Sequence, residues 1–225
     1  MRDADVRRVL RQRLDASYGT DASTIIVEEL GLCRGTVRAD MAVINGILKG
    51  YEIKSDRDTL TRLANQAGTY NRIFDTLTIV VADRHLERTE QIIPSWWGIE
   101  VATADNKSGL RLRSVRDERR NHEIDPFALV QLLWRDEALF LLRQTSRSAH
   151  LEHKPRRFLW QALVNELPIF ELKEHVRECL KNRKCWRAPE EQTQDDGKSL
   201  PCAMLSGSLY PRVASRSRRY IHRPS

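Results

Sequence analysis

Apolar positions in the first half of the chain follow two alternating patterns, one with the period of a helix and one with the period of a strand. A stripe at Val6, Leu10 and Leu14 predicts an amphipathic helix over residues 4–15. The apolar run from Thr76 to Ala82 is short and rich in β-branched residues, which predicts a buried strand parallel to its neighbour. Further helices are expected between 55 and 74 and at 85–91, and further strands at 24–27, 38–44, 48–54, 99–103 and 110–114.

The helical period dominates from residue 125 onward. Asp125-Pro126 is typical of a helix start, and the apolar positions from Phe127 to Leu142 predict one helix there. Two more helices are expected at 158–167 and 170–184, separated by Pro168. The chain is therefore expected to be an α/β protein with three parts: an αβββαβ core in residues 1–120, a helical subdomain in 121–187, and a disordered basic tail in 188–225.

Charged residues interrupt the expected hairpin at 38–54. Asp40 lies in the first strand, and Glu52 and Lys54 lie in the second, among apolar neighbours. Strand interiors disfavour acidic residues, and buried carboxylates are costly unless they are paired or bind a metal. An oxygen-only ligand set favours Mg²⁺ or Mn²⁺ over Zn²⁺. A surface salt-bridge cluster is the alternative.

The loop of this hairpin decides whether the two acids share a face. A two-residue loop at Asn45-Gly46 would pair Asp40 with Tyr51 and place the acids on opposite faces. A three-residue loop over 45–47 would pair Asp40 with Glu52, with Cβ atoms roughly 5 Å apart. The second register also collects apolar residues on the opposite face, and it is the predicted one. Gly50 opposite Ala42 is then expected to leave open space beside the acids.

The next helix carries two further polar candidates. Ser55-x-x-Asp58 resembles a capping box, so the helix is expected to start there. Gln66 and Tyr70 are one turn apart and share a face of this helix. Tyr70 also lies on the apolar stripe, so a role in the core is an alternative for it.

Charge and composition limit the kinds of partner and the cellular location that we expect for this protein. The formal net charge is +7 and the pI is about 9.5, which favours a polyanionic partner. The four cysteines show no C-x-x-C spacing, the N-terminus shows no secretory signal, and no apolar run is long enough to span a membrane. A cytoplasmic location is expected. Trp96-Trp97 could stack on bases or could cap the core.

The order of an Asp, a hairpin with E-x-K and a helix with Q-x-x-x-Y resembles the PD-(D/E)XK nuclease superfamily, which has the restriction-endonuclease-like fold. The Gln66 and Tyr70 pair is similar to that of its RecB-like branch. The segments Glu29-Leu30-Gly31, Gly50 to Ser55, Trp96-Trp97-Gly98 and Trp186-Arg187 also resemble an uncharacterised family of small bacterial proteins of this type. The resemblance covers roughly residues 5–187. Ala39 stands where the superfamily pattern has proline.

This resemblance implies a metal-dependent nuclease that hydrolyses DNA phosphodiester bonds. It implies Asp40 and Glu52 as ligands of Mg²⁺ or Mn²⁺, and it favours Glu29 over Glu28 as a third ligand. Lys54 would position the attacking water, while Gln66 and Tyr70 would complete the catalytic set.

Other functions fit the same residues. The fold could serve as a non-catalytic nucleic-acid-binding or protein-interaction module, or the substrate could be RNA. A protein partner or a homodimer is also compatible with the sequence.

Overall fold

A six-stranded mixed sheet forms the centre of the protein. The computed structural model describes residues 1–105, 109–144 and 151–183, so the expected tail at 188–225 and Trp186-Arg187 lie outside the described residues. The sheet follows chain order, with antiparallel pairs at β1–β2, β2–β3 and β5–β6 and parallel pairs at β3–β4 and β4–β5. The strands are β1 (Ile25–Leu32), β2 (Val37–Ile44), β3 (Leu48–Lys54), β4 (Thr76–Ala82), β5 (Gly98–Asp105) and β6 (Gly109–Arg116).

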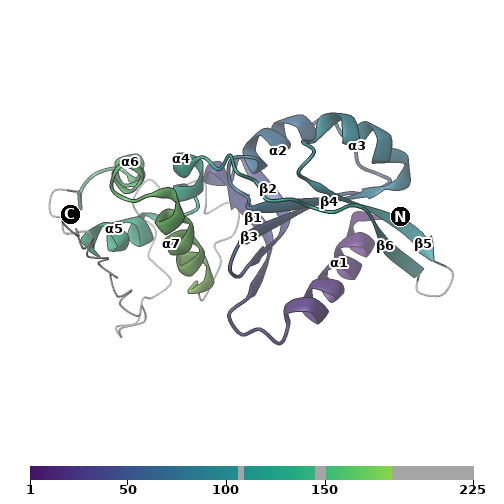
Figure 1. The fold of residues 1–225 in the computed structure, drawn as a ribbon, viewed down its shortest axis with the longest axis horizontal. Coiled ribbons are helices and arrows are strands. Elements are labelled where there is room, and N and C mark those ends of the chain that lie inside the picture. The colour runs from purple at the N-terminus through teal and green to yellow at the C-terminus, as the bar shows by residue number, and fades with distance from the viewer. Residues whose placement is uncertain (106–108, 145–150, 184–225) are drawn as a thin grey trace, which may run out of the picture.

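Helices cover both faces of this sheet (Figure 1). Helix α1 (Asp3–Tyr18) packs on one face, where Val6, Leu10 and Leu14 are buried, as its apolar stripe predicted. Helices α2 (Leu63–Tyr70) and α3 (Leu86–Ile92) lie on the other face. The hairpin strands alternate between these two cores, so they are buried on both faces, whereas the sequence predicted an apolar core only on the face of Met41 and Tyr51. The α/β class and the αβββαβ element order are therefore confirmed.

A group of four helices follows the sheet and lies beyond one end of it (Figure 1). These are α4 (Pro126–Val130), α5 (Arg135–Gln144), α6 (Arg156–Glu166) and α7 (Ile169–Lys181). Their apolar residues belong to the same core cluster as the α2 side of the sheet. An ion pair between Lys173 of α7 and the buried Asp75 also joins the two parts.

The single helix expected from Phe127 to Leu142 is wrong, because α4 ends at Val130 and α5 begins at Arg135. Carbonyl groups in the break accept hydrogen bonds from side chains of distant segments. Arg183 donates to the Leu132 carbonyl at 2.7 Å, and Trp160 donates to the Leu133 carbonyl at 3.3 Å. These tertiary contacts replace the bonds that a continuous helix would make.

The start expected for α2 at Ser55 is also wrong. The Ser55 amide and hydroxyl both donate to the Asp58 carboxylate, at 2.8 and 2.6 Å, but they do so within a turn. The helix begins only at Leu63. No helix in the described ranges is long and apolar enough to cross a membrane.

Gly50 offers a test of the packing between the hairpin and Phe74, which follows α2. A Cβ atom there would lie 2.9 Å from the Phe74 ring, so the space expected beside Gly50 is filled. Gly50→Ala should destabilise the fold by roughly 1–3 kcal/mol through overpacking. Gly68→Ala is the matched control, because nothing lies within 4 Å of its added methyl and alanine favours a helix. Urea denaturation should show opposite signs for the two variants, and equal effects would contradict this packing.

Candidate functional site

The hairpin register is the one that a three-residue loop requires. Ala42 pairs with Gly50 and Ile44 pairs with Leu48, which confirms the predicted loop over residues 45–47. The Asn45 side chain accepts a hydrogen bond from the Ile47 amide and closes the turn. The regular ladder ends at Met41 opposite Tyr51, one residue before Asp40 and Glu52. The predicted pair of Asp40 with Glu52 is not part of the ladder, which stops one step short of it.

Asp40 lies at an irregular point between β1 and β2. The pairing of these strands skips Glu29 and Asp40, and Glu29 has a positive φ of 54°. The Asp40 carboxylate reaches across to β3, where its Oδ2 accepts a hydrogen bond of 2.7 Å from the Ile53 amide. Ile53 lies between Glu52 and Lys54 in the chain. The aspartate is thereby fixed to the backbone that carries the other two candidates.

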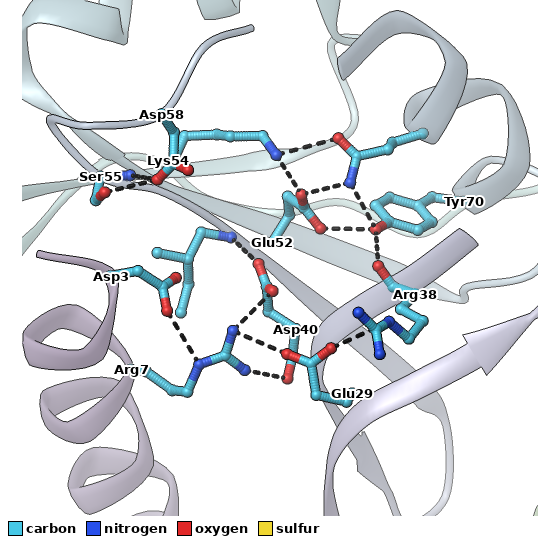
Figure 2. Close-up of polar contacts among 12 residues, drawn as sticks. Asp3, Arg7, Glu29, Arg38, Asp40, Glu52, Lys54, Ser55, Asp58 and Tyr70 are labelled. Carbon is cyan, nitrogen blue, oxygen red and sulfur yellow. Dashed lines mark hydrogen bonds and ion pairs between the residues drawn. The ribbon is translucent and has the colours of Figure 1, made fainter. Parts of the chain in front are cut away.

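Glu52 is the centre of the site (Figure 2). Its side chain is 2% exposed, and both carboxylate oxygens accept hydrogen bonds. Oε1 accepts from Lys54 Nζ at 2.6 Å and from Gln66 Nε2 at 2.7 Å, and Oε2 accepts from the Tyr70 hydroxyl at 2.6 Å. Lys54 also donates to Gln66 Oε1 at 3.1 Å. Residues predicted on two different elements therefore meet on one buried carboxylate.

Tyr70 has both of the roles that its sequence position allowed. Its ring is buried, lies edge-on to Phe74, and stacks on Trp97. Its hydroxyl oxygen lies 2.6 Å from Glu52 Oε2 and 2.7 Å from the Arg38 carbonyl oxygen. A phenol has one proton, so it donates to one of these acceptors at a time. Burial, together with the Glu52 charge, raises the pKa of Tyr70, which keeps the hydroxyl a neutral donor.

Arg7 of α1 is the cation that the sequence did not reveal. Its Nη2 lies 2.9 Å from Asp40 Oδ1 and 3.1 Å from Glu29 Oε1, and its Nη1 donates to the Asp40 carbonyl at 3.0 Å. Glu28 pairs instead with Arg11, at 3.2 Å. Glu29 therefore lies beside Asp40 and Glu28 does not. Arg7 is 33 residues from Asp40 in the chain, so no local pattern could connect them.

The charge of Asp40 is disfavoured by its surroundings. Burial and the nearby Glu52 carboxylate raise the pKa of Asp40 to about 7, while the Ile53 amide and Arg7 act in the opposite direction. Two close carboxylates of this kind are stabilised by a cation. In this structure, Arg7 supplies part of the positive charge that stabilises these carboxylates.

The oxygens present have capacity for a divalent ion. A carboxylate offers about four lone-pair positions. Asp40 accepts one bond on each oxygen, and Glu52 Oε2 accepts one, so both residues could also ligate Mg²⁺ or Mn²⁺. The described part of the chain contains no group of three or more His, Cys, Asp or Glu side chains arranged to hold a metal. Glu29, the third expected ligand, instead pairs with Arg7 and with Arg38.

The fold and site thus define a mixed α/β protein with an acid, lysine and amide cluster at the end of a hairpin. The family described as bacteriophage P4 protein cII matches residues 3–194, and the chain belongs to this family. Protein cII of Enterobacteria phage P4 is 27% identical over 183 residues, which are 81% of this chain and 68% of that protein. A solved structure, SPO1766 protein of unknown function from Silicibacter pomeroyi, aligns with 23% identity and a TM-score of 0.39, over 65% of this chain and 94% of that chain.

The raised pKa of Asp40 predicts how stability depends on pH. The folded state holds the Asp40 proton up to about pH 7, whereas an unfolded aspartate releases it near pH 4. This contribution is complete below about pH 4 and is lost as the pH rises toward 7, by at most roughly 4 kcal/mol. Asp40→Asn should flatten that decline.

Thermal melts between pH 4 and 8 measure the effect. Asp83→Asn is the control, since it removes an exposed carboxylate elsewhere. If wild type and Asp40→Asn lose stability in parallel, Asp40 does not hold its proton in the folded protein.

Proposed function

We propose that this protein is a metal-dependent nuclease of the PD-(D/E)XK type that hydrolyses DNA phosphodiester bonds. The main support is the network around Glu52. Lys54 from β3, together with Gln66 and Tyr70 from α2, bind one buried carboxylate, and Asp40 is fixed to the backbone beside it. Burying a carboxylate is costly, so this many oriented partners on one carboxylate support a functional role for the cluster.

The topology is compatible with the proposal. Helix α1 precedes three antiparallel strands, and α2 leads to β4, which runs parallel to β3. This is the order expected of a restriction-endonuclease-like core. The acids and the lysine lie on β2 and β3, where that fold would carry its catalytic residues.

The side chains divide the chemical roles between them. Asp40 and Glu52 would hold Mg²⁺ or Mn²⁺, which would stabilise the negative charge that develops on phosphate. The Lys54 ammonium has three donors, and Glu52 and Gln66 accept two of them. The third donor could hold a water or a phosphate oxygen. Gln66 orients both the lysine and the glutamate, and Tyr70 fixes the second glutamate oxygen.

DNA is the proposed substrate class because the chain is basic, with a formal net charge of +7. RNA would suit the same chemistry, since discrimination depends on contacts to the 2′-hydroxyl.

One observation favours the alternative of a non-catalytic binding module. Arg7 already contacts the Asp40 carboxyl group, and Glu29 forms ion pairs with Arg7 and Arg38. An internal arginine of this kind could replace a metal permanently and leave a rigid scaffold for nucleic acid or a protein partner. The two functions differ in whether a divalent ion can compete with Arg7.

Metal-dependent thermal shifts address that competition. Millimolar Mg²⁺ or Mn²⁺ should raise the melting temperature of the wild type by mass action. Arg7→Gln should enlarge the shift, because it removes the competing cation, and Asp40→Ala should abolish it. Asp83→Ala, which removes an exposed carboxylate, should respond like the wild type. A shift that survives in Asp40→Ala would place the ion elsewhere.

Cleavage assays separate the enzyme from the binding module. On single-stranded, double-stranded and branched DNA with Mg²⁺ or Mn²⁺, Lys54→Ala should reduce turnover by about 100-fold or more, as expected for loss of a preorganised charge. DNA affinity should change little, because many basic residues share the backbone contacts.

Lys154→Ala is the control for that assay, since it removes an exposed lysine outside the site. All variants need parallel purification and a melting curve, because removing Lys54 leaves Glu52 buried without its cation. Activity that persists equally in Lys54→Ala and Asp40→Ala would come from another protein or another site.

A further inference from the structure

The adjacent residues Trp96 and Trp97 have different environments. Trp97 is fully buried, stacks on Tyr70, and donates from its indole to Asn71 Oδ1 at 2.8 Å. Trp96 is only partly buried, and it lies on the wall of a surface hollow of about 450 Å³. The lining of this Trp96 hollow includes Trp96, Arg119, Arg120, Asn121, His122 and Glu123. Its size is in the range that binds small molecules.

The walls of the Trp96 hollow are tied together by hydrogen bonds. The Arg119 amide donates to the Trp96 carbonyl at 2.8 Å, and its guanidinium donates to the Ser95 carbonyl at 2.9 Å. Arg116 donates to the carbonyls of Trp97 and Pro94, at 2.8 and 3.2 Å. The turn that carries Trp96 is therefore held before any ligand arrives. Preorganised walls reduce the entropy cost of binding.

Asn121, which also lines the hollow, is held in place by hydrogen bonds. The Asn121 side chain donates to the carbonyls of Asn71 and Phe74, at 2.7 and 3.0 Å, and its Oδ1 accepts from the Glu123 amide at 2.9 Å. The Asn121 backbone amide donates to the Asp75 carbonyl. These bonds hold residues 119–123 against the end of α2 and leave Arg120 and His122 exposed at the rim.

The chemistry of the lining combines a planar aromatic surface with positive charge. An indole can stack on a base, and arginine donors fit phosphate oxygens. Arg119 uses one of its five side-chain donors on Ser95, and Arg120 is exposed to solvent. The lining contains one acidic residue, Glu123, and two arginines, so its formal charge is positive. A duplex keeps its bases stacked, so an indole in this position suits a single strand.

We propose that the Trp96 hollow binds one nucleotide of a single-stranded nucleic acid. The base stacks on Trp96, and the flanking phosphates lie against Arg119 and Arg120. The hollow lies next to the C-terminal end of α2, whose residues Gln66 and Tyr70 contact Glu52. This binding does not require catalysis, so it can be tested independently of the proposed nuclease activity.

Fluorescence anisotropy of a labelled ten-nucleotide thymidine strand, in EDTA at fixed salt, tests the proposal. Trp96→Ala should weaken binding by about tenfold or more, as expected for loss of one base stack. Trp96→Phe should retain most of the affinity because it keeps a π surface. Arg120→Gln should weaken binding more than Arg157→Gln, which removes an exposed arginine of α6 outside the hollow.

An abasic strand with the same number of phosphates isolates the contribution of the base. It should bind the wild type about as weakly as the thymidine strand binds Trp96→Ala. Equal affinity of the wild type for both strands would overturn the proposal, as would unchanged binding in Trp96→Ala. Asp83→Ala, which removes an exposed carboxylate outside both sites, should bind the thymidine strand like the wild type. Binding is measured in EDTA, where no metal-dependent cleavage occurs, so loss of nuclease activity and loss of this site are distinguishable.

Discussion

The structure around the hairpin depends on the buried carboxylate of Glu52. A charge that is 2% exposed is tolerable only when its oxygens are fully hydrogen-bonded. Lys54, Gln66 and Tyr70 meet that requirement, and in doing so they fix the position of α2 over the hairpin. Tyr70 extends this link, because its ring contacts both Phe74 and Trp97 in the core. The packing of this face and the geometry of the site are therefore set by the same residues.

Asp40 introduces a second charge that the fold must balance. It lies where β1 and β2 lose their regular pairing, and its carboxylate accepts from the Ile53 amide. Arg7 and Glu29 complete the charge arrangement on its other side. The nearby Glu52 carboxylate and burial together raise the pKa of Asp40, so its negative charge is costly in this position. Under the proposed function, a divalent ion would compete with Arg7 for Asp40, and the outcome of that competition would separate the enzyme from the binding module.

The chain belongs to the bacteriophage P4 protein cII family, and the family description names no reaction. The proposed chemistry consequently rests on this chain's own residues. The Glu52 cluster lies beside α2, and the Trp96 hollow lies next to the C-terminal end of this helix. Tyr70 contacts Glu52, while the next residue, Asn71, contacts Trp97 and Asn121. Helix α2 is therefore the element that would relate strand binding to chemistry.

The sequence by itself determined the order of strands and helices in residues 1–120, because α1 has a helical apolar period and β4 is a short run of β-branched residues. It also determined the hairpin register, since only the three-residue loop places Met41 and Tyr51 on a common apolar face. Side-chain parity then placed Glu52 and Lys54 together, and helical spacing placed Gln66 beside Tyr70. Both rules follow from the backbone geometry of a short segment, so they can be applied without reference to the rest of the chain.

Only the tertiary structure decided the remaining features. The pairing of Arg7 with Asp40 joins α1 to β2, the break between α4 and α5 depends on Arg183 and Trp160, and the Phe74 ring fills the space beside Gly50. The different environments of Trp96 and Trp97 also arise from packing, because both residues have the same local sequence context. Each of these features depends on contacts between segments that are distant in the chain, and such contacts leave no periodic pattern in the sequence.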